Sequence, residues 1–81
     1  MAVKIGTITH YYDKIGVAVV KLIKPMVAGD TIKISGKGRE FTQVVSSIQK
    51  EHQELKKAKK GDDIGMKVDQ PVKPKDVVFK I

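Results

Sequence analysis

The chain has 81 residues, with 16 Lys or Arg against nine Asp or Glu, which gives a formal net charge of +7. It contains no cysteine, and this excludes disulfides, thiol nucleophiles and thiolate metal sites. The length predicts one domain over residues 1–81, whose core must be mainly aliphatic because aromatic residues make up only 5% of the chain.

The first half of the chain has the hydrophobic periodicity of β-strands. Residues 4–12 are rich in Thr, Ile and Tyr, which fit a pleated surface. A hairpin loop is expected at 13–16, followed by an apolar strand over 16–22 that ends at Lys24–Pro25 because proline removes a ladder donor. Residues 31–34 alternate, with both isoleucines on one face.

The middle of the chain keeps the strand period less strictly. Residues 40–48 predict a strand, but Ile48 falls out of step, and a bulge near 46–47 would restore the register. The stretch QKEHQELKKAKK, residues 49–60, has too thin an apolar stripe to anchor a helix. We expect a short strand from His52 to Leu55 there, and then a turn.

Two alternating strands complete the pattern. Residues 64–68 place Ile, Met and Val on one face. The last strand, VVFKI, predicts Val77, Phe79 and Ile81 facing inward with Lys80 outward. Short strands separated by a turn every 8 to 12 residues predict a sandwich or a small barrel.

An aspartate stands just before three of these strands, in the stretches AGDTIKI, KGDDIGMKV and PKDVVFKI. Glycine can adopt the positive φ that a tight turn needs, and aspartate can accept hydrogen bonds from backbone amides. We therefore predict structural turns shaped by Gly29, Asp30, Gly61, Asp62 and Gly65. This explanation is favoured over acidic ligands that converge on a metal.

Several stretches, taken in order, resemble the β-barrel that follows the GTPase domain in translation factors, domain II of elongation factor Tu. They are Gly6-Thr7-Ile8, Val27-Ala28-Gly29-Asp30, residues 45–48, Ala58 to Gly65, and residues 75–78. The closest likeness is to stand-alone elongation-factor-like proteins and to the C-terminal barrel of collagenase-like peptidase-family proteins. It is carried by THYYDKIGVAVV, EFTQ and SSIQKEH. The resemblance implies an all-β fold, a closed six- or seven-stranded Greek-key β-barrel.

Catalytic and cofactor motifs are missing from the sequence. There is no G-x-x-x-x-G-K-[ST] motif, so we expect no nucleotide binding and no GTPase activity. The only histidines, His10 and His52, stand far apart and form no ligand pair. No serine lies in a G-x-S-x-G elbow. We expect neither a cofactor, nor a metal, nor catalysis.

Two groups of cations are candidates for contact with nucleic-acid phosphates. They are Lys56, Lys57, Lys59 and Lys60 in one group, and Lys37 and Arg39 in the other. Tyr11 and Tyr12 are the candidates for base stacking, although strand alternation would turn one of them inward. The lysines also have a structural explanation, because they solubilise hairpins and discourage edge pairing.

The main hypothesis from the sequence is a non-catalytic RNA-binding module, associated with translation, that contacts tRNA or rRNA through a basic rim. The alternative is a protein-interaction module that docks on a larger enzyme such as a collagenase-like peptidase-family protein. An independent hydrolase is the least favoured. No apolar run reaches the roughly 20 residues of a membrane span, and MAVKIGTITHYY lacks a signal-peptide hydrophobic region. We therefore expect a cytoplasmic location and no membrane partner.

Overall fold

The computed structural model describes residues 2–50 and 53–81. Its elements are β1 Val3–Tyr12, β2 Val17–Leu22, β3 Met26–Val27, β4 Thr31–Gly36, β5 Arg39–Val44, β6 Ile48–Lys50, β7 Gln53–Leu55, β8 Lys57–Ala58, β9 Asp63–Lys67 and β10 Val77–Lys80. No helix occurs within these ranges, so the prediction of an all-β fold is confirmed. In particular, no helix there has the length and apolar character needed to cross a membrane.

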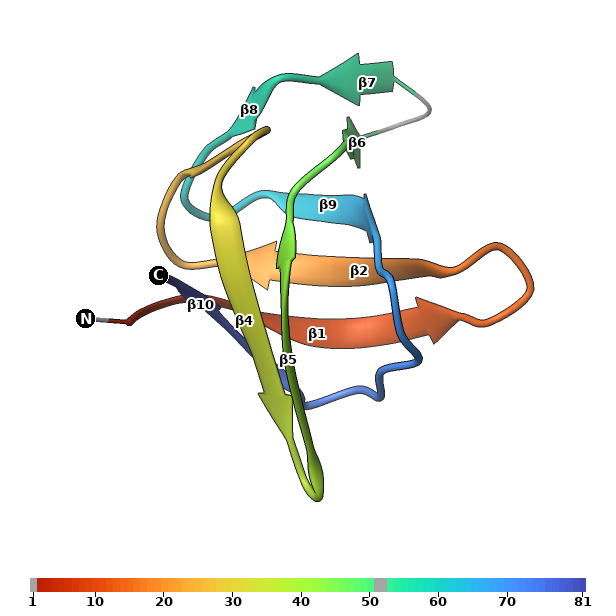
Figure 1. The fold of residues 1–81 in the computed structure, drawn as a ribbon. Coiled ribbons are helices and arrows are strands. Elements are labelled where there is room, and N and C mark those ends of the chain that lie inside the picture. The colour runs from red at the N-terminus through yellow and green to blue at the C-terminus, as the bar shows by residue number, and fades with distance from the viewer. Residues whose placement is uncertain (1, 51–52) are drawn as a thin grey trace.

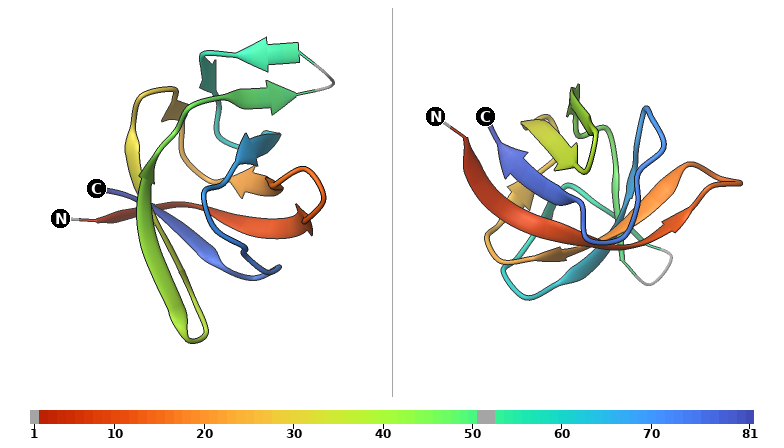
Figure 2. Two further views of the ribbon diagram at one scale, coloured as in Figure 1. Left: turned by 45° about the vertical axis from the view of Figure 1, so that its right-hand side comes forward. Right: turned by 90° about the horizontal axis from the view of Figure 1, so that it is seen from below.

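The strands form one large and one small sheet. Eight strands pair in the order β5-β4-β10-β1-β2-β9-β6-β7, and β3 pairs with β8. Figures 1 and 2 show the large sheet coiling strongly, with β1 and β10 side by side so that Val3 pairs with Lys80. Register shifts between Lys4 and Gly6 and between Ile8 and His10 interrupt the pairing of β1. Such irregularities let a long strand bend around a core.

The sheet is open, which corrects the prediction of a closed barrel. Among the described strands no backbone ladder joins β5 to β9 or to β7. The side chain of Gln43 bridges this opening instead, because its Nε2 donates to the Lys67 carbonyl at 2.9 Å and its Oε1 accepts from the Asp69 amide at 2.8 Å. Gln43 is only 6% exposed, so these bonds satisfy a buried amide. A side chain thus takes the place of a ladder between β5 and the end of β9.

The core is aliphatic and follows the predicted alternation in most strands. Ile32 and Ile34 of β4 are buried, and so are Ile64, Met66 and Val68 in and after β9. Fully burying one such side chain stabilises the fold by about 1.5–3 kcal/mol. The strands at 31–34 and 64–68 therefore have the faces that the sequence predicts.

The last strand faces the opposite way from the prediction. Val78 is completely buried, whereas Val77 and Phe79 are half-buried and Ile81 is 54% exposed. Val78 pairs with Ile34, and residues directly opposite each other share a face of the sheet, so Val78 follows Ile34 into the core. Apolar residues occupy both faces of this strand, and alternation alone could not choose between them.

The chain crosses from one part of the sheet to another after β5. The predicted bulge near 46–47 is instead a break, because β5 ends at Val44 and β6 begins at Ile48. Across this break the Val45 amide donates to the Asp30 carbonyl at 2.9 Å, and the Gly29 amide donates to the Val45 carbonyl at 2.8 Å. Val45 and Ile48 are therefore both buried, although they are out of step along the sequence.

The lysine-rich stretch of residues 49–60 is not helical where the structure describes it. Residues 53–55 and 57–58 are strands, which confirms the choice of strand over helix. The predicted strand start at His52 lies outside the described residues.

Candidate functional site

The three aspartates that precede strands form the same turn, here called the Asp turn. In each one the Asp carboxylate accepts a hydrogen bond from the amide three residues earlier. The pairs are Asp30 with Val27, Asp62 with Lys59 and Asp76 with Lys73, at 3.0, 3.0 and 3.1 Å. The repeated sequence pattern is thus a repeated hydrogen-bond pattern at the entry to β4, β9 and β10.

The residue before each of these aspartates has a positive φ. The values are +97° at Gly29, +90° at Gly61 and +80° at Lys75. Glycine adopts such angles without steric cost, whereas a lysine there is strained. The first two Asp turns therefore have a glycine at the position that needs a positive φ, and the third does not.

Gly65 is not in a turn, which corrects the prediction made for it. It lies inside β9 and pairs with Val19 of β2 and Gln49 of β6. A Cβ at this position would approach Cγ1 of Val17 to 3.3 Å. Because Gly65 has no side chain, Val17 can pack closely over the middle of β9.

Each Asp turn also holds a cation from another strand. Lys80 Nζ lies 3.7 Å from Asp30, Lys50 Nζ lies 3.0 Å from Asp62, and Arg39 Nη1 lies 3.0 Å from both carboxylate oxygens of Asp76. Asp76 is the buried member, at 4% exposed. The ion pairs tie the turns to the sheet, and Arg39, a predicted phosphate contact, is paired with a buried carboxylate.

The predicted lysine group surrounds the second Asp turn. Its members, all exposed, are Lys56, Lys57, Lys59 and Lys60. Their backbone has structural contacts, since the Lys56 carbonyl accepts from the Ala28 amide at 2.7 Å and Lys57 pairs with Val27 of β3. The lysine group therefore lies on and next to the small β3–β8 sheet, and its backbone is part of the fold.

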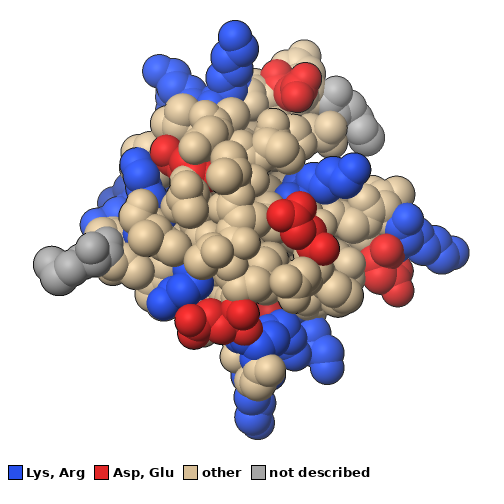
Figure 3. Space-filling model, in the orientation of Figure 1, with Lys and Arg blue, Asp and Glu red and all other residues tan. Residues whose placement is uncertain are grey.

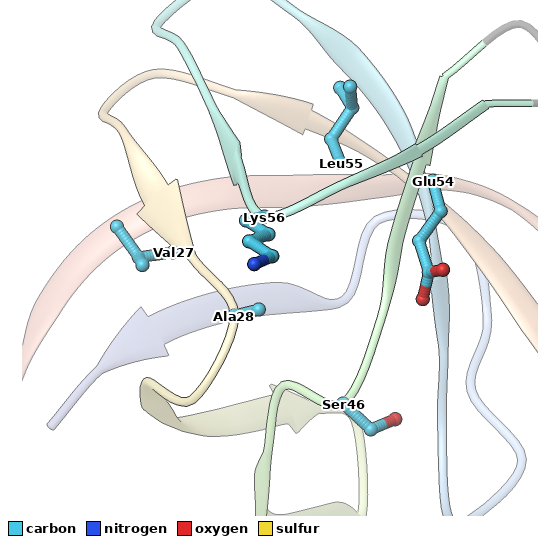
Figure 4. Close-up of a pocket in the computed structure, with 6 residues that line it drawn as sticks. All are labelled: Val27, Ala28, Ser46, Glu54, Leu55 and Lys56. Carbon is cyan, nitrogen blue, oxygen red and sulfur yellow. The ribbon is translucent and has the colours of Figure 1, made fainter.

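A hollow of about 460 Å³ lies beside Lys56. Val27, Ala28, Ser46, Glu54, Leu55 and Lys56 line it. Figure 4 shows the side chains of Lys56 and Glu54 reaching toward this space while Leu55 points the other way. Because the two charged groups are of opposite sign, this hollow is a poor site for an anion.

The two predicted cation groups lie at opposite ends of the molecule. Lys37 is exposed in the turn between β4 and β5, and this hairpin tip is far from β8 in both Figure 1 and Figure 2. On the face shown in Figure 3 the blue side chains are spread around the outline, with red ones between them. On this face the cations therefore do not form one continuous positive patch.

The fold brings two further lysines, which the sequence did not predict as contacts, to the β4–β5 tip. They are Lys73 and Lys75, on the connection from β9 to β10. A hollow of about 380 Å³, called the basic hollow, is lined by Gly36, Lys37, Arg39, Lys73, Pro74, Lys75 and Asp76. The signal in the sequence was the stretch PVKPKD, in which prolines hold lysines on an extended connection.

Another hollow adjoins the basic hollow. It measures about 580 Å³, is called the Tyr11 hollow, and is lined by His10, Tyr11, Asp13, Pro71, Val72, Lys73 and Pro74. Lys73 and Pro74 line both hollows, so the two form one surface on either side of the 71–76 connection. We call this the connection surface.

The predicted pair of stacking tyrosines is split between two environments. Tyr11 is half-buried against the core and lines the Tyr11 hollow. Tyr12 is 49% exposed, and its ring centroid lies 4.4 Å from that of His10 at 58°. Successive residues of a strand point to opposite faces, so the two rings do not make a joint platform.

Acidic and imidazole groups do not gather in the described part of the chain. There, no group of three or more His, Cys, Asp or Glu side chains is placed to hold a metal ion. His10 lines the Tyr11 hollow together with Asp13. His52 lies outside the described residues.

No family model matches the chain. It is 36% identical over 78 residues to an uncharacterised protease of Methanocaldococcus jannaschii, and this match covers 95% of the chain but 19% of that protein. The chain thus spans about a fifth of the length of this relative.

Two solved structures share the fold. Both are of the C-terminal domain of a Geobacillus thermoleovorans protein assigned to the U32 peptidases. One, a selenomethionine variant, is 26% identical with a TM-score of 0.89 and covers 94% of this chain and 96% of that one. The other is 28% identical with a TM-score of 0.89 and covers 95% and 90%.

These similarities correct the functional hypothesis drawn from the sequence. They support the likeness to the C-terminal domain of collagenase-like peptidase-family proteins, and not the likeness to domain II of elongation factor Tu. The expected association with translation is therefore wrong. That prediction rested on a likeness to the β-barrel of translation factors, and it failed because one fold can carry unrelated functions.

Proposed function

We propose that the chain is a non-catalytic protein-interaction module that docks on a larger protein of the U32 peptidase group. The observation that carries this proposal is the size of the match. Nearly the whole chain corresponds to one domain of such a protein and to about a fifth of an uncharacterised protease. The part of these proteins that the chain matches is a small β domain beside a much larger remainder, so a contact with such a larger protein is the role proposed for it.

The surface of the protein supports a docking role. The connection surface combines two adjoining hollows, one lined mainly by apolar groups and one by cations. Interfaces between proteins typically centre on an apolar pocket with charged groups at the rim. The non-catalytic role and the cytoplasmic location both stay predictions from the sequence.

A capture experiment tests the proposal. The tagged chain would be incubated with a nuclease-treated lysate of the cells in which it occurs, beside an unrelated basic protein of similar size and charge. We expect one larger protein, similar to U32 peptidases, in stoichiometric amounts with the chain alone. Recovery of nucleic acid from an untreated lysate, without any stoichiometric protein, would count against a docking role.

A further inference from the structure

We propose that the connection surface binds an acidic segment of the partner protein that carries one large apolar side chain. The apolar side chain would enter the Tyr11 hollow, and carboxylates beside it would meet the basic hollow. This inference rests on the proposed function, since it names the surface and the chemistry of the partner.

The charge of the basic hollow selects an anionic partner. Arg39 is neutralised by Asp76, with Nη1 at 3.0 Å from both oxygens. Within the described part of the chain, the exposed side chains of Lys37, Lys73 and Lys75 have no ion-pair partner. Three uncompensated cations around one hollow favour carboxylates by charge complementarity. On the face shown in Figure 3, some of the blue side chains lie at the end where Figure 1 places the β4–β5 tip, with red ones beside them.

The Tyr11 hollow is shaped for an apolar anchor. Pro71 and Pro74 are exposed on its walls, Tyr11 is half-buried, and Val72 is 3% exposed. Large apolar side chains that fill such pockets provide most of the binding free energy in many interfaces. Lys73 stands between the two hollows, so an anchor and a neighbouring carboxylate can be bound together.

Hydrogen bonds fix the connection before any partner arrives. The Lys75 amide donates to the Ile8 carbonyl at 2.7 Å, and the Ile8 amide donates to the Asp76 carbonyl at 2.8 Å. The Asp76 carboxylate holds the Lys73 amide at 3.1 Å, and the prolines restrict φ. Binding to a surface already held in place costs less conformational entropy.

The same surface is poorly suited to RNA. Binding of single strands relies on exposed aromatic faces on which successive bases stack. Here Tyr11 packs against the core and Tyr12 does not line either hollow. An acidic polypeptide is therefore the occupant that the observations favour.

Two charge-reversal variants test the inference with the same change in net charge. The first replaces Lys37, Lys73 and Lys75 by Glu, and the matched control replaces Lys56, Lys57 and Lys60 by Glu at the other end. Affinity for the protein recovered in the capture experiment would be measured by biolayer interferometry, after circular dichroism has shown that both variants are folded. We expect the first variant to bind at least tenfold more weakly and the control to change less than about threefold.

Amide chemical shifts of the unchanged protein provide a second readout that needs no variant. Titration with the partner is expected to perturb residues 10–13, 37–39 and 71–76 more than residues 53–60. Equal binding by the first variant, or perturbations centred on 53–60, would overturn the inference and leave the docking function in place. Perturbation of the connection surface by RNA, with no effect of the protein partner, would overturn it too. Failure to recover any protein partner would overturn both proposals.

Discussion

The second and third Asp turns share their hydrogen bonds but differ in their surroundings. In both, the carboxylate accepts from the amide three residues earlier and meets a cation at 3.0 Å. Asp62 and its partner Lys50 are partly exposed, with side-chain exposures of 22% and 40%. Asp76 has a side-chain exposure of 5%, and its partner Arg39 of 26%. One turn stands at the surface, and the other is built into the protein.

Different contacts hold the two turns in place. The second turn has Gly61 at its positive φ, so the local sequence already favours it. The third has Lys75 at that position and is held by neighbours, through the bonds to Ile8 and the ion pair with Arg39. Gly36 leaves the room that the Asp76 carboxylate occupies. Tertiary contacts thus maintain a turn that its own sequence disfavours.

Removal of the buried carboxylate is expected to have the largest effect. Asp76→Ala leaves Arg39 and the Lys73 amide without their partner, and loss of one member of a largely buried pair costs about 3 kcal/mol. Urea unfolding followed by far-ultraviolet circular dichroism measures the change. Asp62→Ala, the matched change at the surface turn, should destabilise the protein less because water replaces the lost bonds. Equal losses would mean that burial does not distinguish the two turns.

The space around Asp76 gives the next largest effect. A Cβ on Gly36 would overlap the Asp76 carboxylate, so Gly36→Ala should displace it and reduce the free energy of unfolding by about 2 kcal/mol. Gly38 in the same hairpin meets nothing within 4 Å but has φ +76°. Gly38→Ala should therefore cost about 1 kcal/mol, from backbone strain alone. The same urea titration compares them, and a larger loss for Gly38→Ala would contradict the role of Gly36.

The sequence predicted the second Asp turn, whose determinants are local. It did not predict the tertiary contacts that hold the third. Gly-Asp before an alternating strand is enough to indicate a turn, because both the positive φ and the carboxylate acceptor are local. Nothing near Asp76 in the sequence points to Arg39, which lies far away along the chain. The basic hollow was missed for this reason, since it assembles only when the β4–β5 hairpin meets the 71–76 connection.

Strand faces were predictable where one face is clearly polar. Ile32 and Ile34 alternate with Thr31 and Lys33, and the structure buries the isoleucines as predicted. The last strand is apolar on both faces, and its pairing with β4 decided the outcome. The open sheet could not be predicted from periodicity, because the bond that bridges it comes from the side chain of Gln43.

A smaller change in stability is expected to depend on pH, and it comes from Asp62 in the second Asp turn. The Lys59 amide, followed by the Lys50 ammonium, lowers the pKa of Asp62 below its ordinary value of 3.8. The folded state therefore binds this proton less readily than the unfolded state does. The stabilisation is complete above the ordinary pKa and is lost as pH falls through the folded pKa.

Comparison with Asp62→Asn isolates this contribution. The difference in the free energy of unfolding between the wild type and the variant should be constant above about pH 5 and shrink below about pH 4. Urea titrations at a series of pH values measure it. The remaining carboxylates titrate in both proteins and cancel in the difference. A difference that grows as the pH falls would contradict the assigned direction of the pKa shift.

The strained lysine provides the smallest effect and the only gain. Lys75→Gly removes the cost of a positive φ on a non-glycine residue, about 1 kcal/mol, and adds roughly half of that in unfolded-state entropy. The bond from residue 75 to the Ile8 carbonyl involves only backbone atoms and is retained. We expect a gain of about 0.5 kcal/mol, or a rise in Tm of about 2–4 °C. Gly61→Lys, which places lysine at the same position of the surface turn, should lower the Tm. A rise with Gly61→Lys, or a fall with Lys75→Gly, would show that tertiary contacts and not φ decide which residue each turn accepts.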